Sequence, residues 1–132
     1  FLNYIMPRHH SQSVRQLKIR RFKLDRIPLQ SIVQIVGPRG NGKSKLMQEF
    51  CYVNCGRFDD VHAWSYTDYM NLELEDFIPR QNIHHRFRER DMSKIVQKQE
   101  QEWRQYNWNV KHGRPATPGK EICFILDDCA FK

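Results

Sequence analysis

The eight residues from Gly37 to Ser44 have the types and spacing of a phosphate-binding loop, because they fit the pattern G-x-x-x-x-G-K-[ST]. In such a loop, backbone N–H groups and the positive end of the following helix face the same anion. We expect Lys43 to reach the β- and γ-phosphates of a nucleotide and the Ser44 hydroxyl to bind Mg²⁺. The predicted nucleotide-binding set is therefore Gly37, Pro38, Arg39, Gly40, Asn41, Gly42, Lys43 and Ser44.

Three glycines give this loop its expected backbone freedom. Gly37, Gly40 and Gly42 lack a Cβ atom, so we predict left-handed dihedral angles that let the backbone close on a phosphate. A chance glycine-rich turn is the alternative interpretation. That alternative requires neither a strand before the loop nor a helix after it.

Two adjacent acidic residues, Asp127 and Asp128, follow the apolar run Ile122–Leu126. A strand that ends in an acidic residue places it at the carboxyl edge of the sheet, where open α/β sheets bind ligands. We predict that Asp127 holds Mg²⁺ opposite Ser44, and that Asp128 orients or deprotonates the attacking water. With Lys43 and Asp128 as the catalytic residues, the two motifs predict a site for ATP and Mg²⁺.

An arginine commonly accelerates phosphoryl transfer, by about 10³–10⁵-fold. The sequence offers several candidates and singles out none of them: Arg80, Arg86, Arg88, Arg90 and Arg114. The alternation of three of these arginines within a polar stretch favours a solvated segment over a ligand site.

The elements that must position the site follow from the apolar pattern. Ile32–Val36 is a near-continuous apolar run, which predicts a strand covered on both faces. After the loop, Lys45–Cys55 has a partial helical period, and Gly56 is expected to terminate that helix. A second strand is predicted over Val61–Tyr66. Strand, loop and helix in this order are the context that the phosphate-binding motif requires.

The stretch from 69 to 90 carries no clear periodicity. We expect Phe77–Pro79 to be a loop or a short extended piece. The adjacent histidines His84 and His85 lie among polar residues, and we place them at the surface or in a loop.

A long amphipathic helix is predicted from Asp91, a good N-cap residue, to Val110. Its aromatic residues Trp103 and Tyr106 are expected to anchor it to the core. A loop over 112–119 then leads to the strand that ends in the acidic pair. This alternation predicts the α/β class, with a parallel sheet between layers of helices: the three-layer sandwich of a P-loop NTPase.

The charge of the chain is uneven. The 132 residues carry a net charge of +7, and +6 of it lies in residues 1–30, where the loose alternation Val14–Phe22 could form an edge strand. We therefore divide the chain into a basic arm or edge strand (1–30) and an NTPase core (31–132). The arm suits a nucleic-acid backbone, a solvated surface or a docking edge. No apolar run is long enough for membrane insertion. The chain begins at Phe1, and we expect it to be a piece of a longer protein or a truncated one.

Four cysteines are present, Cys51, Cys55, Cys123 and Cys129, and none forms a C-x-x-C pair. No histidine spacing completes a zinc-binding set. We expect free thiols in a reducing compartment.

The sequence resembles the poxvirus-type genome-packaging ATPases of large double-stranded DNA viruses, within the FtsK–HerA superfamily. The resemblance rests on five elements from about Ile32 to Cys129: Gly37–Ser44, the strand ending Trp64-Ser65-Tyr66-Thr67, Phe77-Ile78-Pro79, a helix with Gln97, Gln99 and Gln101, and Phe124–Cys129. Matched by position, Lys43 and Ser44 are the nucleotide and metal residues, Asp127 the Mg²⁺ acid and Asp128 the water-orienting acid. Many superfamily members have Glu where this chain has Asp128.

The resemblance implies an ATP-driven motor that moves viral double-stranded DNA into a capsid. Its expected partners are other copies of the chain in a ring, the DNA and capsid components, in the host cytoplasm (the viral factory) or the virion. Such motors continue with further strands, a polar sensor residue and a trans-acting arginine, so we expect an N-terminal part whose sandwich is incomplete at the C-terminus. The alternatives are a non-catalytic nucleotide-binding or assembly module and a small P-loop kinase.

Overall fold

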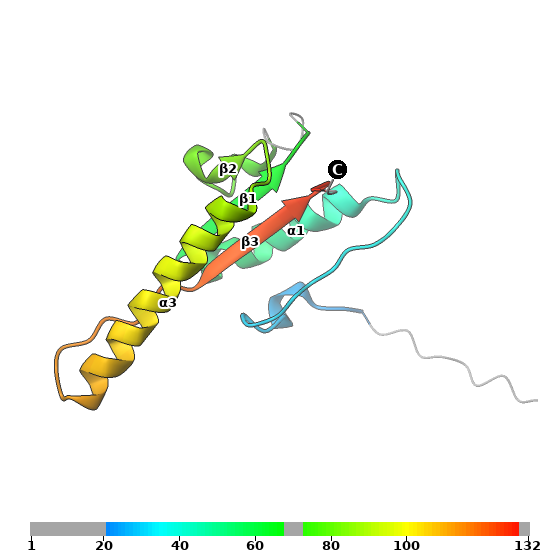
Figure 1. The fold of residues 1–132 in the computed structure, drawn as a ribbon. Helices are drawn as coiled ribbons and strands as arrows, with labels where there is room; N and C mark the ends of the chain where they lie inside the picture. The colour runs from blue at the N-terminus through cyan, green and yellow to red at the C-terminus, as the bar shows by residue number, and fades with distance from the viewer. Residues whose placement is uncertain (1–20, 68–72, 130–132) are drawn as a thin grey trace, which may run out of the picture.

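The computed structural model describes residues 21–67 and 73–129. They form an α/β fold in which two long helices accompany a three-stranded sheet (Figure 1). The elements, with η for a 3-10 helix, are η1 (Leu24–Arg26), α1 (Lys43–Asn54), η2 (Cys55–Arg57), β1 (Asp60–Ser65), η3 (Arg80–Asn82), β2 (Ile83–His84), α3 (Glu89–Lys111) and β3 (Ile122–Asp127).

The sheet is parallel, as the alternation of elements predicts, with strand order β2-β1-β3. β1 and β3 pair along their whole length, from Asp60 opposite Ile122 to Ser65 opposite Asp127. β2 is much shorter and pairs with β1 through Ile83 and His84. The carboxyl ends of β1 and β3 therefore meet at the same level of the sheet.

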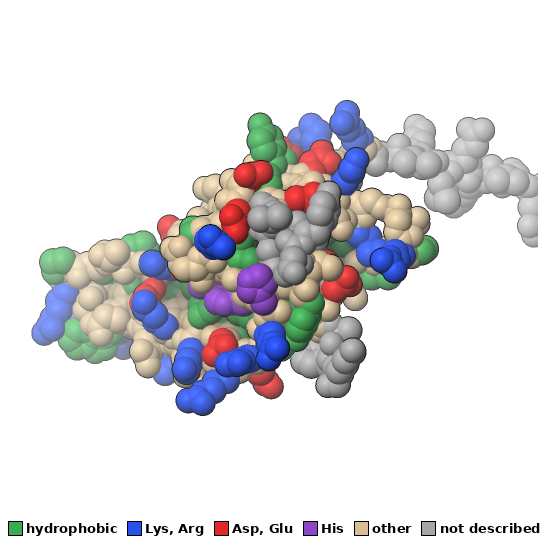
Figure 2. Space-filling model, turned by 90° about the horizontal axis from the view of Figure 1, so that it is seen from above, with side chains coloured by type: hydrophobic (Ala, Val, Ile, Leu, Met, Phe, Trp, Pro, Cys, Tyr) green, Lys and Arg blue, Asp and Glu red, His purple; other side chains and the backbone are tan. Residues whose placement is uncertain are grey.

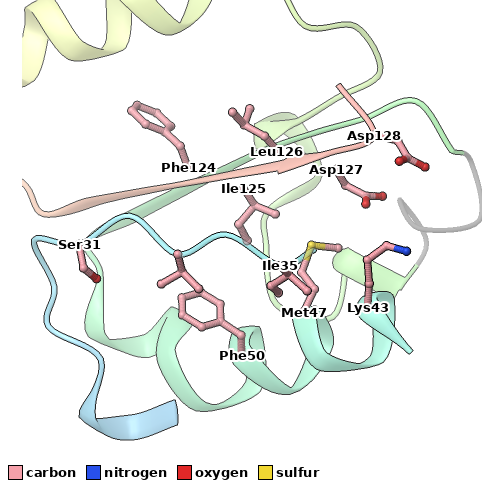
Figure 3. A pocket seen from close by; sticks show the side chains of 11 residues that line it. Ser31, Ile35, Lys43, Met47, Phe50, Phe124, Ile125, Leu126, Asp127 and Asp128 are labelled. Atoms are coloured by element: carbon pink, nitrogen blue, oxygen red, sulfur yellow. The ribbon is translucent and has the colours of Figure 1, made fainter. Parts of the chain in front are cut away.

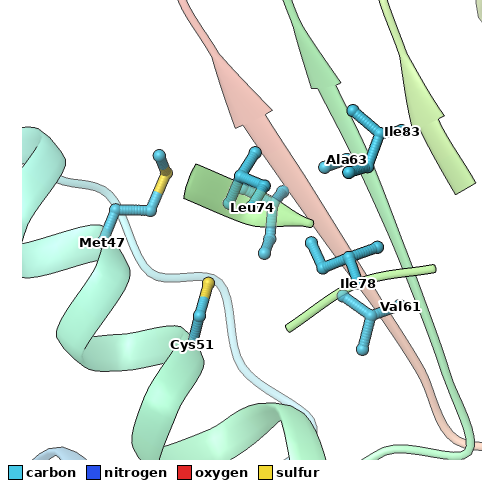
Figure 4. Close-up of a cluster of buried hydrophobic side chains, with 8 residues drawn as sticks. Met47, Cys51, Val61, Ala63, Leu74, Ile78 and Ile83 are labelled. Atoms are coloured by element: carbon cyan, nitrogen blue, oxygen red, sulfur yellow. The ribbon is translucent and has the colours of Figure 1, made fainter. Parts of the chain in front are cut away.

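The two helices lie on opposite faces of the sheet (Figures 1 and 3). Because side chains alternate along a strand, Val61 and Ala63 of β1 face the α1 side. There they pack with Met47 and Cys51, which recur four residues apart on α1 (Figure 4). On the α3 side, Trp64 is fully buried and stacks on His84, with ring centroids 4.8 Å apart.

Two core residues come from the stretch with no clear periodicity. Leu74 and Ile78 are almost completely buried and join the cluster beneath α1. The same stretch contains His84, and the expectation that His84 lies at the surface or in a loop is wrong, because it belongs to β2. Its ring is half-buried because it stacks on Trp64, whereas His85 is exposed as predicted.

The helix α3 begins earlier than predicted. Arg88, not Asp91, is the N-cap residue, and Asp91 lies in the first turn, where its charge suits the helix dipole. No α3 side chain is fully buried, so Trp103 and Tyr106 are half-buried contacts and not core anchors. The helix is tied to the loop before β3, where Gln99 Nε2 donates to the Lys120 carbonyl at 2.8 Å.

The predicted strand over Ile32–Val36 is wrong. The segment forms no ladder with the three strands of the described sheet, and Ile32 and Val36 are 100% and 81% exposed. An apolar run forms a strand only where a neighbouring strand accepts its backbone hydrogen bonds. Here a cavity separates the segment from β3. Ile35 alone packs against the core cluster.

The remaining expectations concern the ends of the first helix and the start of the chain. The helix α1 begins two residues before the predicted Lys45, and Gly56 lies in η2 without a left-handed backbone. Most of the predicted arm (1–30) and of the edge strand Val14–Phe22 lies outside the described residues.

Candidate nucleotide-binding site

The loop before α1 contains two glycines with left-handed backbone. Gly40 has a φ of 83° and Gly42, the N-cap residue of α1, has a φ of 76°. Gly37 does not share this conformation, so the prediction for Gly37 is wrong. Because α1 begins at Lys43, the unpaired N–H groups of its first turn lie directly after the loop.

The Lys43 side chain folds back over this loop. Its Nζ donates hydrogen bonds to the carbonyl oxygens of Gly37 and Pro38, each at 2.8 Å. The ammonium group is therefore held beside the backbone that an anion would approach. A phosphate oxygen would be a stronger acceptor for this group than a neutral carbonyl, because the hydrogen bond would join two charged groups.

A cavity of about 240 Å³ lies between the segment 31–35 that precedes the loop, α1 and β3 (Figure 3). It brings together Lys43 from α1 with Asp127 and Asp128 from the end of β3. The other lining residues are mostly apolar: Ser31, Val33, Ile35, Met47, Phe50, Phe124, Ile125 and Leu126. Of the predicted site residues, Ser44 and the loop from Gly37 to Gly42 do not line the cavity, and Ser44 is exposed beside it.

Asp127 is half-buried, and this burial raises the pKa of its carboxyl group above the usual range. The Ser65 hydroxyl opposes the rise by donating to Asp127 Oδ2 at 3.2 Å. The neighbouring Asp128 raises the pKa further, whereas Thr67 and the Lys43 ammonium lower it. A cation bound here would be attracted to a carboxylate that has lost part of its hydration.

Asp128 sits at a sharp turn of the chain. It is exposed, and its φ of 49° makes it the one non-glycine residue with a positive φ in the part of the chain that the structure describes. Aspartate tolerates this conformation better than most residues. Beyond the turn, Cys129 Sγ donates to the Trp64 carbonyl at 3.3 Å, which ties the chain after β3 to the end of β1.

The oxygen donors at this site fit Mg²⁺, which prefers carboxylate, hydroxyl and phosphate oxygens. Asp127 and Ser44 would hold the ion. Within 21–67 and 73–129, no group of three or more His, Cys, Asp or Glu side chains is arranged to hold a metal on its own. A Mg²⁺ ion at a nucleotide needs no such group, because phosphates and waters complete its coordination. All four cysteines are free thiols.

Two hydroxyl residues at the end of β1 escaped the sequence prediction. Ser65 and Thr67 contact each other and lie beside Asp127. Both residues come at the end of an apolar run, as the acidic pair does. That position could have identified them as site residues from the sequence. None of the candidate arginines lines the cavity. Arg80 pairs with Glu75, and Arg114 stacks on Trp108.

Comparisons with models of protein families, with curated proteins and with solved structures found no match for this chain. Among the described residues, no helix has the length and the apolar character needed to cross a membrane.

Proposed function

We propose that this chain binds and hydrolyses ATP with Mg²⁺. One observation supports the proposal above all others. Lys43 and the pair Asp127–Asp128 are separated by more than eighty residues in the sequence, yet they line one cavity beside the start of α1. A cation, two carboxylates and unpaired helix N–H groups are the donors and acceptors that a Mg-triphosphate requires.

Each of these residues has a distinct proposed role. Lys43 and the N–H groups from Gly37 to Ser44 bind the phosphates, and Ser44 and Asp127 hold Mg²⁺. The ion would neutralise charge on the phosphate oxygens. Asp128 is the nearest further carboxylate, and it would orient the attacking water or accept its proton.

The motor function is a further part of the proposal. The resemblance to genome-packaging ATPases supports a subunit that moves double-stranded viral DNA into a capsid, in a ring of copies, within the host cytoplasm or the virion. The excess of basic residues in 1–30 suits the DNA backbone. Figure 2 shows that lysine and arginine side chains of the described residues stand at several places on the face seen from above, with acidic side chains among them.

One observation favours a second candidate, a module that binds nucleotide without turning it over. Among the described residues, no arginine lines the cavity, where a group that accelerates phosphoryl transfer would be expected. This candidate predicts tight Mg-ATP binding, with hydrolysis near the background rate even when copies of the chain assemble.

Binding is tested with a fluorescent ATP analogue titrated in the presence of Mg²⁺. The matched pair is Lys43→Ala and Lys45→Ala, which remove the same charge from neighbouring positions on α1. We expect Lys43→Ala to weaken binding by about 10- to 100-fold, the worth of a charged hydrogen bond, and Lys45→Ala to have little effect. Equal affinities for both variants would contradict the proposal.

The motor function is tested separately by ATP hydrolysis with and without double-stranded DNA. We expect DNA to stimulate the wild-type rate and the Lys43→Ala rate to stay at background. Binding without hydrolysis under both conditions would favour the second candidate.

A further inference from the structure

The parallel register brings a hydroxyl residue against the acidic half of the site. Ser65 and Asp127 are the last residues of β1 and β3, and they are direct partners in the ladder. Both side chains therefore project from the same level of the sheet, on the face that α1 covers. Ser65 is only 1% exposed, whereas Asp127 is half-buried at the edge of the cavity.

Three hydrogen bonds meet at the Ser65 hydroxyl. Its Oγ lies 3.2 Å from Asp127 Oδ2 and 3.2 Å from Thr67 Oγ1, and the Thr67 backbone N–H donates to it at 3.4 Å. A serine hydroxyl offers one hydrogen to donate and two lone pairs to accept. The arrangement therefore uses the full hydrogen-bonding capacity of this group.

The direction of each bond follows from the carboxylate. An ionised Asp127 only accepts, so the single Ser65 hydrogen points at Oδ2. Thr67 is then the donor in its two contacts with Ser65, from its hydroxyl and from its backbone N–H, and its hydroxyl also interacts with the Asp127 carboxylate. Thr67 fixes the Ser65 hydroxyl, and Ser65 fixes one oxygen of Asp127.

We infer that Ser65, oriented by Thr67, is a positioning residue that sets the Asp127 carboxylate for divalent metal at the nucleotide. The inference rests on the proposed function, because it concerns the same site. The Ser65 hydrogen bond engages Oδ2, and Asp127 lines the cavity in which the metal would bind. Residues that orient a metal ligand in this way typically change metal affinity by about 10- to 100-fold when they are replaced.

The experiment measures metal dependence and requires no turnover. The affinity for the fluorescent ATP analogue is measured in EDTA and then across a titration of Mn²⁺, whose binding is also followed by its paramagnetic resonance signal. Ser65→Ala removes the hydroxyl without adding volume, and Ser65→Thr restores a hydroxyl. Thr67→Val removes the second hydroxyl at an exposed position, where the cost to folding is small.

We expect Ser65→Ala to raise the Mn²⁺ concentration for half-maximal binding by about 10-fold, Thr67→Val to raise it less, and Ser65→Thr to recover most of the loss. Affinity in EDTA, which depends on the loop, should stay unchanged in all three variants.

Three results would overturn the inference, and they are distinguishable. If wild-type protein shows no metal-dependent binding, the proposed function fails and the inference fails with it. If wild-type binding is metal-dependent but Ser65→Ala and Thr67→Val need the same Mn²⁺ concentration, the inference alone fails. An equal loss of affinity with and without metal would make Ser65 a purely structural residue, which also overturns it.

Discussion

The loop from Gly37 to Ser44, which contributes Lys43 to the cavity, and the acidic pair Asp127–Asp128 are held in different ways. The described hydrogen bonds of the loop are local, from Lys43 Nζ to Gly37 and Pro38 and from Asn41 N to Pro38. Asp127 instead depends on Ser65, 62 positions earlier in the chain. The loop is thus specified by its own residues, whereas the acidic half depends on the register of β1 against β3.

The largest expected effect distinguishes the contribution of the acidic pair to nucleotide binding from that of the loop. Asp127→Asn should weaken Mg²⁺-dependent nucleotide binding by about 100-fold, because a charged interaction worth roughly 1.5–3 kcal/mol is lost. Binding in EDTA should change little, since the loop is intact. Titration of nucleotide with and without Mg²⁺ measures both affinities. Asp128→Asn is the matched control, and an equal loss of metal dependence in that variant would refute the separate roles of the two acids.

A substitution far from the cavity tests how strongly β3, the strand that ends in Asp127, depends on the packing of its preceding loop against α3. A Cβ atom on Gly119 would lie 2.6 Å from the Trp103 ring, so Gly119→Ala overpacks the contact between α3 and the loop before β3. We expect the free energy of unfolding to fall by about 1–3 kcal/mol, measured by chemical denaturation.

The smaller ring of Trp103→Phe should recover part of that loss in the double variant. If Gly119→Ala is as stable as the wild-type protein, α3 does not constrain the entry to β3.

The loop should respond to a local change of backbone. Gly42 has a φ of 76°, and Gly42→Ala forces a side chain into the left-handed region at a cost of about 1–2 kcal/mol. We expect nucleotide binding in EDTA to weaken by about 10-fold, the equivalent of roughly 1.4 kcal/mol. Gly56→Ala is the control, because Gly56 has neither a positive φ nor an atom within 4 Å of the added Cβ. Equal affinities would show that the loop does not need this conformation.

The smallest expected effect concerns pH and the α3 side of the sheet. Burial, and then the adjacent His62, lowers the pKa of His84 below its ordinary value of 6.5, while Asp91 opposes the change. The folded protein therefore binds this proton less readily than the unfolded chain. Stability from this group is complete above about pH 6.5 and is lost as the pH falls through the lowered pKa.

Thermal unfolding between pH 7 and pH 5 measures this contribution. The midpoint should fall less with acidity in His84→Gln than in the wild-type protein. Parallel curves for the two proteins would contradict the assignment.

Much of the architecture follows from local sequence. The runs that became β1 and β3 are apolar and end in polar residues, and the parallel arrangement follows from their alternation with helices. Gly40 and Gly42 took the backbone expected of their motif. These features depend on neighbouring residues or on a simple period, so the sequence expresses them directly.

The failures share a dependence on distant partners. Ile32–Val36 has the composition of a strand, but a cavity lies between it and the open edge of β3, so it forms no ladder there. Leu74 and Ile78 are buried because other elements cover them, not because of any period of their own. The contact of Ser65 with Asp127 depends on the register of β1 against β3, and no local sequence pattern predicts that register.

The unpaired edge of β3 has a consequence for the behaviour of the protein in solution. Only β1 pairs with β3 among the described residues, and the opposite edge borders the cavity beside exposed Leu126 and Val33. Free backbone groups next to apolar side chains are a template for strand addition by another chain. In the described part of the sheet, this edge of β3 is therefore the place where a strand from another chain would add.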